Sequence, residues 1–196
     1  MAARRYDQII KLIQEVKPKT IVEIGVHKGL RSVLMCREAM KFHEEITYFG
    51  FDVFSGDEQF HKDALNGKGP PSEVEAGRRL EALGPSLTWF LIKGDTRDTL
   101  HGRKNYQADL VFIDGDHRLE VIRGDYDPFE NSPCVVFDDF FHLGDSKHLD
   151  LTKYGCNGLI YDLLDQNRRV DILPIADATN IGALTKLAVV WPEVKE

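Results

Sequence analysis

Several features that would assign this chain to a special class are missing. The sequence has only three cysteines, Cys36, Cys134 and Cys156, and none of them lies in a CxxC pair. An odd number without that spacing argues against a disulfide framework and predicts reduced, mostly buried thiols. His142, His148 and Cys156 also lack the spacing of a structural zinc site.

Long apolar runs are missing as well. No stretch approaches the ~20 residues that a bilayer span requires, and polar residues interrupt the apolar positions near the N-terminus. We therefore expect neither a membrane segment nor a signal peptide, and a cytoplasmic location is the default expectation.

The chain has no surplus of basic residues. Its 25 Lys and Arg stand against 32 Asp and Glu, a formal net charge of −7. Binding to a phosphate backbone needs a basic face, so we expect no nucleic-acid partner. The 42% hydrophobic and 29% charged residues are typical of a globular protein, and 196 residues fit one domain, residues 1–196.

What the chain does contain is a regular alternation of short apolar runs and helical patterns. The runs expected to form strands are Thr20 to Ile24, Ile46 to Phe51, Leu87 to Ile92, Ala108 to Ile113, Cys134 to Phe137, Val170 to Ile175 and Leu184 to Trp191. The last two are close enough in sequence to pair antiparallel. The prediction is an α/β fold: a doubly wound, Rossmann-like, mostly parallel seven-stranded sheet with a C-terminal antiparallel hairpin and helices on both faces.

Three further segments complete this layout. Residues 1–17 carry an amphipathic helical stripe that ends at Pro18. Residues 53–71 and 140–155 are predicted to be long connections, and connections of that length are usually lids or binding loops. We expect these two loops to build the substrate pocket, although nothing in them names the substrate.

The stretch ADLVFIDGDH, residues 108–117, is where we expect chemistry. Its apolar half has the composition of a strand buried on both faces, and it ends abruptly at Asp114, Asp116 and His117. Open α/β sheets bind their ligands at the carboxyl ends of such strands. Three titratable groups within four positions at that end indicate a functional site.

The turn after the first expected strand, EIGVHKG at residues 23–29, favours a nucleoside ligand. The dinucleotide fingerprint G-x-G-x-x-G is absent because His27 and Lys28 interrupt it, so a pyrophosphate cradle is poorly supported. Asp52, at the end of the next strand, is placed to accept hydrogen bonds from ribose hydroxyls. The alternative is an ordinary tight turn between a strand and a helix.

Motifs after four successive strands together resemble the class I S-adenosylmethionine-dependent methyltransferases. They are Glu23-x-Gly25-x-x-x-Gly29, Asp52, Gly94-Asp95-Thr96 and FIDGDH. FIDGDH and VFDDF are similar to the macrocin-type O-methyltransferases, which act on sugars and other natural-product hydroxyls. The resemblance runs from about Thr20 to Trp191 and departs from the pattern at His27, where many members have a small residue.

This resemblance implies a set of contacts with S-adenosylmethionine. Backbone around Gly25 would hold the methionine part, Asp52 the ribose hydroxyls and Asp95 the adenine amino group. The cofactor-binding residues expected on this basis are Glu23, Gly25, Val26, His27, Gly29, Asp52, Asp95, Thr96 and Asp114.

The acids Asp114, Asp138 and Asp139 predict a cation site. They follow the fourth and fifth expected strands, and three unpaired carboxylates at neighbouring strand tips would stay ionised only around a cation. Hard oxygen ligands suit Mg²⁺, Mn²⁺ or Ca²⁺, and metal-dependent O-methyltransferases are similar in placing acids here. The alternative is that these acids accept from backbone in turns and helix caps.

Asp116 and His117 compete for the role of general base. The resemblance favours Asp116, whereas His117 has an unperturbed pKa nearer neutrality. The resulting hypothesis is a methyltransferase that methylates a small-molecule or sugar hydroxyl with help from a divalent cation. Its rivals are a nicotinamide-dependent oxidoreductase on a related fold and a non-catalytic nucleoside-binding domain, and the sequence leaves the acceptor and any homo-oligomer open.

Overall fold

The computed structural model describes residues 4–54, 70–103, 106–142, 150–151, 154–179 and 182–192. These residues form an eight-stranded sheet with strand order β3-β2-β1-β4-β5-β8-β6, and β7 pairs with β8. The strands are β1 (Thr20–Ile24), β2 (Ile46–Asp52), β3 (Leu87–Lys93), β4 (Leu110–Ile113), β5 (Val135–His142), β6 (Val170–Ile172), β7 (Asp177–Ala178) and β8 (Leu184–Val190). Strands β1 to β5 run parallel, while β8 is antiparallel to its neighbours β5, β6 and β7.

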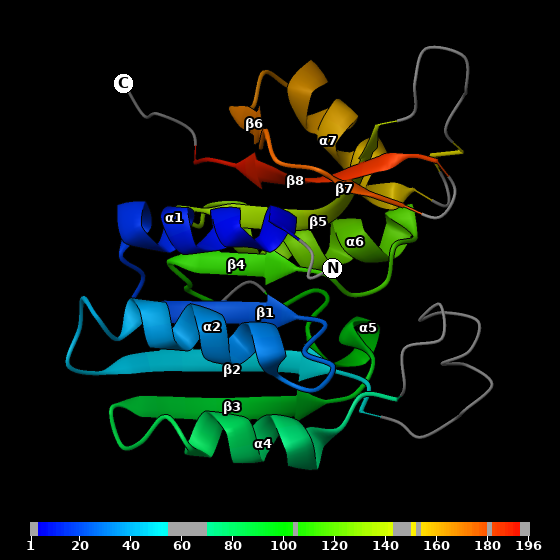
Figure 1. Cartoon of the computed structure of the whole chain (residues 1–196). Coiled ribbons are helices and arrows are strands. Elements are labelled where there is room, and N and C mark those ends of the chain that lie inside the picture. Colours follow the sequence, from blue (N-terminus) through cyan, green and yellow to red (C-terminus); the bar gives the residue numbers. More distant parts are fainter. Residues whose placement is uncertain are drawn as a thin grey trace.

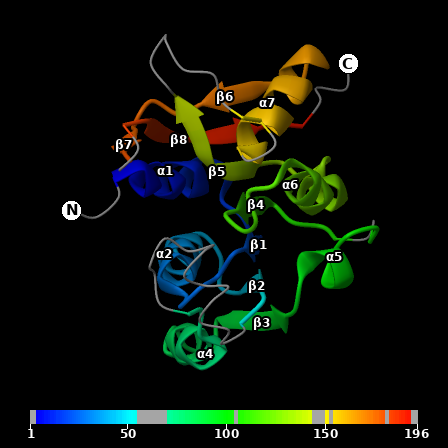
Figure 2. The ribbon, with the colours of Figure 1, turned by 90° about the vertical axis from the view of Figure 1, so that its right-hand side faces the viewer.

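Helices cover both faces of this sheet. They are α1 (Asp7–Val16), α2 (Leu30–Ala39), α4 (Glu73–Glu81), α5 (Thr96–Thr99), α6 (Leu119–Tyr126) and α7 (Gly155–Asp165), with 3-10 turns η1 (Arg4–Tyr6) and η2 (Asp127–Phe129). Helices α1, α2 and α4 lie on one face and α5, α6 and α7 on the other (Figures 1 and 2). Within the described ranges, no helix combines the length and apolar character needed to cross a membrane.

The strand pleat divides the core between these two layers. In β1, Ile21 belongs to the buried cluster under α1 and α2, while Val22 and Ile24 belong to the cluster under α6 and α7. Successive side chains of a strand point to opposite faces, so an unbroken apolar run such as β4 fills both layers at once. The predicted doubly wound, mostly parallel sheet is confirmed.

The fifth strand is longer than predicted. The sequence suggested an end at Phe137 and a loop over residues 140–155, but β5 continues to His142 because β8 supplies an antiparallel partner past the end of β4. The short β7 is an additional strand within the connection that was expected to be all turn. Residues 55–69 of the first expected loop, and 143–149 and 152–153 of the second, lie outside the described residues.

Candidate active site

The turn between β1 and α2 is packed tightly against the end of β4. The Gly25 N–H donates to the Phe51 carbonyl at 2.9 Å, and the Asp114 N–H donates to the Ile24 carbonyl at 2.8 Å. Gly25 has φ +93°, and a Cβ at this position would lie 2.0 Å from the Asp114 carbonyl oxygen. Only glycine fits here, and the reason is contact within the protein as well as any approach to a ligand.

The other residues of this turn present mainly backbone groups, and not side chains, to a ligand. Gly29 has φ +74° and caps the N-terminus of α2. The Val26 side chain is 3% exposed and packs with Phe54 in a small buried cluster. His27 is also left-handed, with φ 55°, and its N–H donates to the Asp52 carboxylate at 2.7 Å.

Asp52 is held by its own neighbourhood at the end of β2. One carboxylate oxygen accepts from the His27 N–H at 2.7 Å and the other from the Phe54 N–H at 3.0 Å. Each carboxylate oxygen has two acceptor positions, so capacity remains for ribose hydroxyls. The Gly94 N–H donates to the Asp52 carbonyl at 3.0 Å, which ties this strand end to the end of β3.

Asp95 follows that glycine and caps the short helix α5, which begins at Thr96. Its carboxylate accepts from the Arg97 N–H at 2.9 Å and pairs with the Arg97 guanidinium. These hydrogen bonds lower the pKa of Asp95 to about 2. An adenine amino group would therefore meet a carboxylate that is ionised at neutral pH and shared with an arginine.

Glu23 lies beneath the turn rather than at its surface. Its side chain is fully buried, and its Oε2 accepts from the Tyr48 hydroxyl at 2.5 Å and from the Ser32 hydroxyl. Burial raises the pKa of Glu23, while the charge of Arg31 acts in the opposite direction. Its Oε1 has no hydrogen-bond partner in the described part of the chain, while its Oε2 links β1 to α2 and β2.

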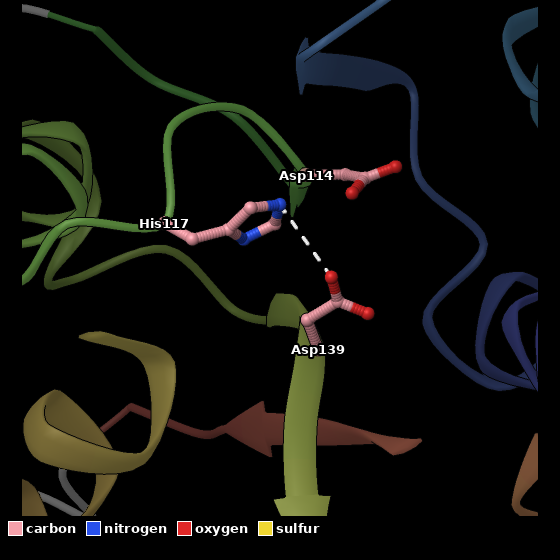
Figure 3. Close-up of side chains that lie close together, drawn as sticks. All are labelled: Asp114, His117 and Asp139. Carbon is pink, nitrogen blue, oxygen red and sulfur yellow. Dashed lines mark ion pairs between the residues drawn. The ribbon is translucent and has the colours of Figure 1, made fainter. Parts of the chain in front are cut away.

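A second group of side chains gathers at the end of β4 and just past the point where β5 stops pairing with β4. Asp114 and His117 come from the loop after β4, and Asp139 comes from β5 (Figure 3). One ligand atom from each of these residues lies within 4.8 Å of the others, and His117 Nε2 is 3.5 Å from Asp139 Oδ2. Among the described residues, this is the group that could hold a metal ion.

A β-bulge separates the paired acids of β5. The register with β8 shifts between Phe137 and Phe140, and Asp139 adopts a left-handed φ of 57°. A bulge inserts an extra residue and re-aims the side chains at that point. Asp138 and Asp139 are neighbours in sequence, but they therefore face different partners.

Asp138 is not brought into the group. Its side chain is 1% exposed and accepts from Arg5 Nε at 2.7 Å, from Arg5 Nη2 at 3.0 Å and from the Tyr6 hydroxyl. Burial alone would raise its pKa, but the hydrogen bonds and charge of Arg5 hold the pKa of Asp138 below its ordinary value. Asp138 is thus a buried, ion-paired carboxylate.

The expectation of three unpaired carboxylates is therefore wrong, because two arginines already pair with them. Arg31 of α2 forms an ion pair with Asp114, and its guanidinium lies 4.6 Å from the ring centroid of Tyr6. Arg5 also pairs with Asp177 at 3.1 Å. No local sequence pattern links residue 5 or residue 31 to acids more than 80 positions away.

A cation still fits this surrounding charge. Four carboxylates, Asp114, Asp138, Asp139 and Asp177, face two guanidinium groups, so negative charge is in excess. Burial raises the pKa of Asp114 to about 7, although Arg31 opposes this shift. Two carboxylates and one imidazole suit Mn²⁺ better than Ca²⁺, because imidazole is a ligand of transition metals.

Asp116 stands apart from this group. Its carboxylate accepts from the Arg118 N–H at 2.9 Å and pairs with the Arg118 guanidinium at 3.0 Å. Partial burial raises its pKa, but the hydrogen bonds from Arg118 outweigh it and the net pKa is lowered. His117, in contrast, is placed beside Asp139.

The chain belongs to a known family. Residues 22–133, more than half of the sequence, match the family described as "Methyltransferase domain". Together with the fold, this makes the protein a class I S-adenosylmethionine-dependent methyltransferase. The nicotinamide-dependent alternative has no support from this family.

Solved structures share the fold at low identity. TomG, an O-methyltransferase from Streptomyces achromogenes involved in tomaymycin synthesis and solved with S-adenosylmethionine, is 18% identical with a TM-score of 0.62, over 98% of this chain and 82% of TomG. An O-methyltransferase from Bacillus cereus, solved with S-adenosylhomocysteine, is 16% identical with a TM-score of 0.62, over 97% of this chain and 82% of the other. No curated protein matches the sequence.

Proposed function

We propose that this methyltransferase methylates a hydroxyl oxygen of a small-molecule or sugar acceptor, with a divalent cation held by Asp114, His117 and Asp139. The observation that carries the proposal is the convergence of these three side chains at the ends of β4 and β5. Support for an oxygen acceptor comes from the O-methyltransferases that share the fold and from the macrocin-type resemblance of FIDGDH and VFDDF.

In this proposal the turn backbone after β1, Asp52 at the end of β2 and Asp95 after β3 would hold the cofactor. Bound S-adenosylmethionine supplies a methyl group on a positively charged sulfur, which is open to attack by an oxygen nucleophile. Asp52 accepts from the ribose hydroxyls with the acceptor capacity that its two backbone partners leave. Glu23, fully buried below the turn, supports the turn backbone through its contacts with Ser32 and Tyr48.

The cation site orients the acceptor. Asp114, His117 and Asp139 would hold the cation, which would supply Lewis acidity that lowers the pKa of the acceptor hydroxyl, so that a weak base would be enough to remove its proton. His117 is a ligand in this arrangement, and Asp116 is left as the base, as the sequence favoured. The hydrogen bonds from Arg118 lower the pKa of Asp116 and make its carboxylate a weaker base, so this role depends on the cation to acidify the acceptor hydroxyl.

The test is methyl transfer with and without metal. Chelator-treated protein is given S-adenosylmethionine and a panel of vicinal diols, catechols and glycosides, and S-adenosylhomocysteine formation is followed. We expect turnover only after Mn²⁺ or Mg²⁺ is restored, and only with hydroxyl acceptors. Equal rates in the chelated and reloaded protein would show that the cation assignment is wrong.

The roles of the neighbours His117 and Asp116 separate in the same assay. His117→Gln should weaken Mn²⁺ binding, while Asp116→Asn should leave it unchanged and lower kcat. If Asp116→Asn keeps full kcat, Asp116 is not the base.

A further inference from the structure

The two carboxylate oxygens of Asp139 have different surroundings. Oδ1 accepts a hydrogen bond from the Thr185 hydroxyl at 3.1 Å and lies 3.4 Å from Arg5 Nη2. Oδ2 lies 3.5 Å from His117 Nε2, on the side of the proposed cation. One oxygen is therefore engaged by the protein, and the other is presented to the site.

We propose that Thr185 of β8 is a positioning residue for the cation site, because it holds Oδ1 of Asp139 so that Oδ2 faces His117 and Asp114. This inference rests on the proposed function, since it assumes that Asp139 binds the cation. Metal-ligating carboxylates are generally oriented by hydrogen bonds from outside the coordination sphere, and loss of such a partner costs roughly 10- to 100-fold in metal affinity.

The backbone around Thr185 is well placed for this task. Thr185 is 4% exposed and pairs across the sheet with Phe141 of β5 and Asp177 of β7. Two partner strands hold its main chain, so its hydroxyl is a rigid donor. Asp139 lies at the left-handed position of the bulge, and the Thr185 hydroxyl is the nearer of the two groups that contact its Oδ1, the other being Arg5 at 3.4 Å.

Arg5 also touches Oδ1 but acts mainly elsewhere. Its guanidinium makes two hydrogen bonds to Asp138 and one to Asp177. Removing Arg5 would change the charge near the cation as well as the geometry, and these effects on affinity oppose each other. Thr185 is neutral, so a substitution there tests positioning alone.

The experiment measures Mn²⁺ affinity by titration calorimetry on the full chain. Thr185→Val keeps the shape of the side chain and removes the hydroxyl, and Thr185→Ser keeps the hydroxyl. We expect Thr185→Val to weaken Mn²⁺ binding by about 10-fold or more and Thr185→Ser to stay within about 3-fold of the wild type. S-adenosylhomocysteine affinity should be the same in all three proteins.

Each outcome bears on a different statement. If Thr185→Val binds Mn²⁺ as the wild type does, with only a lower Tm, the hydroxyl is merely structural and the inference is overturned while the proposed function stands. If the wild type binds no Mn²⁺, the cation part of the proposed function is wrong, and the positioning role of Thr185 is then wrong as well. Should Thr185→Val not fold, Thr185→Ala against Thr185→Ser makes the same comparison of a side chain with and without the hydroxyl.

Discussion

The carboxyl edge of the sheet has two halves that are built in different ways. At the ends of β2 and β3, two candidate cofactor residues are oriented from their own or the adjoining turn: Asp95 by Arg97, and Asp52 by Phe54 and His27. At the ends of β4 and β5, the acids meet Arg5, Arg31 and Thr185, which come from distant parts of the chain. The first half depends on local turns and the second on the assembled fold.

The largest expected effect tests the first half, where the candidate cofactor residues lie. Asp52→Ala removes the proposed ribose acceptor and also releases the N–H groups of His27 and Phe54. S-adenosylhomocysteine affinity, measured by calorimetry, should fall roughly 100-fold, since hydrogen bonds to a charged group are involved. Asp98→Ala, an exposed acid on α5, is the control and should keep full affinity. Unchanged affinity in Asp52→Ala would contradict the assignment of this half.

The second half, at β4 and β5, is tested by substituting Asp138 and Asp139 of the bulge one at a time. Asp139→Asn should weaken Mn²⁺ binding on the order of 100-fold, because it removes a proposed ligand. Asp138→Asn should keep Mn²⁺ affinity within about 5-fold and lower the Tm, because the buried guanidinium of Arg5 then loses one of its carboxylate partners, the one that accepts two of its hydrogen bonds. Equal loss of Mn²⁺ binding in both variants would restore Asp138 as a ligand, as the sequence predicted.

The junction of the two halves is tested at Gly25. Gly25→Ala would drive a Cβ into the Asp114 carbonyl at a left-handed φ, so the free energy of unfolding should fall by about 3 kcal/mol or more. Gly84→Ala has a similar φ of +92° but open space around its Cβ, and should cost about 1 kcal/mol. Urea denaturation measures the free energy of unfolding of both variants. Equal losses in the two would mean that Gly25→Ala causes no clash with Asp114.

The smallest effect concerns pH and the attachment of η1. Burial raises the pKa of Asp177, but hydrogen bonds from the backbone N–H groups of Arg4 and Arg5 and from the Arg5 side chain lower it overall. A lowered folded-state pKa means that this stabilisation is present above the unfolded value of about 3.9 and is lost as pH falls through the folded-state pKa.

The difference in Tm between wild type and Asp177→Asn should therefore be full at pH 7 and shrink below about pH 4. Glu44→Gln, at an exposed carboxylate, should differ less from the wild type in Tm, and this difference should vary less with pH. A difference for Asp177→Asn that does not vary with pH would argue against the ion pair.

Most of the fold could be predicted because its signals are local. The unbroken apolar run Leu110–Ile113 marks a strand buried on both faces, and the first five runs predicted as strands form β1 to β5, the parallel part of the sheet. Ser72 with Glu75 three residues on is a local helix-start pattern, and the Ser72 side chain accepts from the Glu75 N–H at 3.2 Å as the N-cap of α4. Asp52 and Asp95 could be placed at neighbouring strand ends for the same reason.

The sequence by itself determined that acids directly follow the apolar runs at residues 110–113 and 135–137. Only the tertiary structure decided what each acid does. The antiparallel pairing of β5 with β8 creates the bulge that turns Asp138 toward Arg5 and Asp139 toward His117. Thr185 meets Asp139 only through that pairing. Register between strands far apart in the chain follows from packing of the whole sheet, so no local pattern could have separated the two acids.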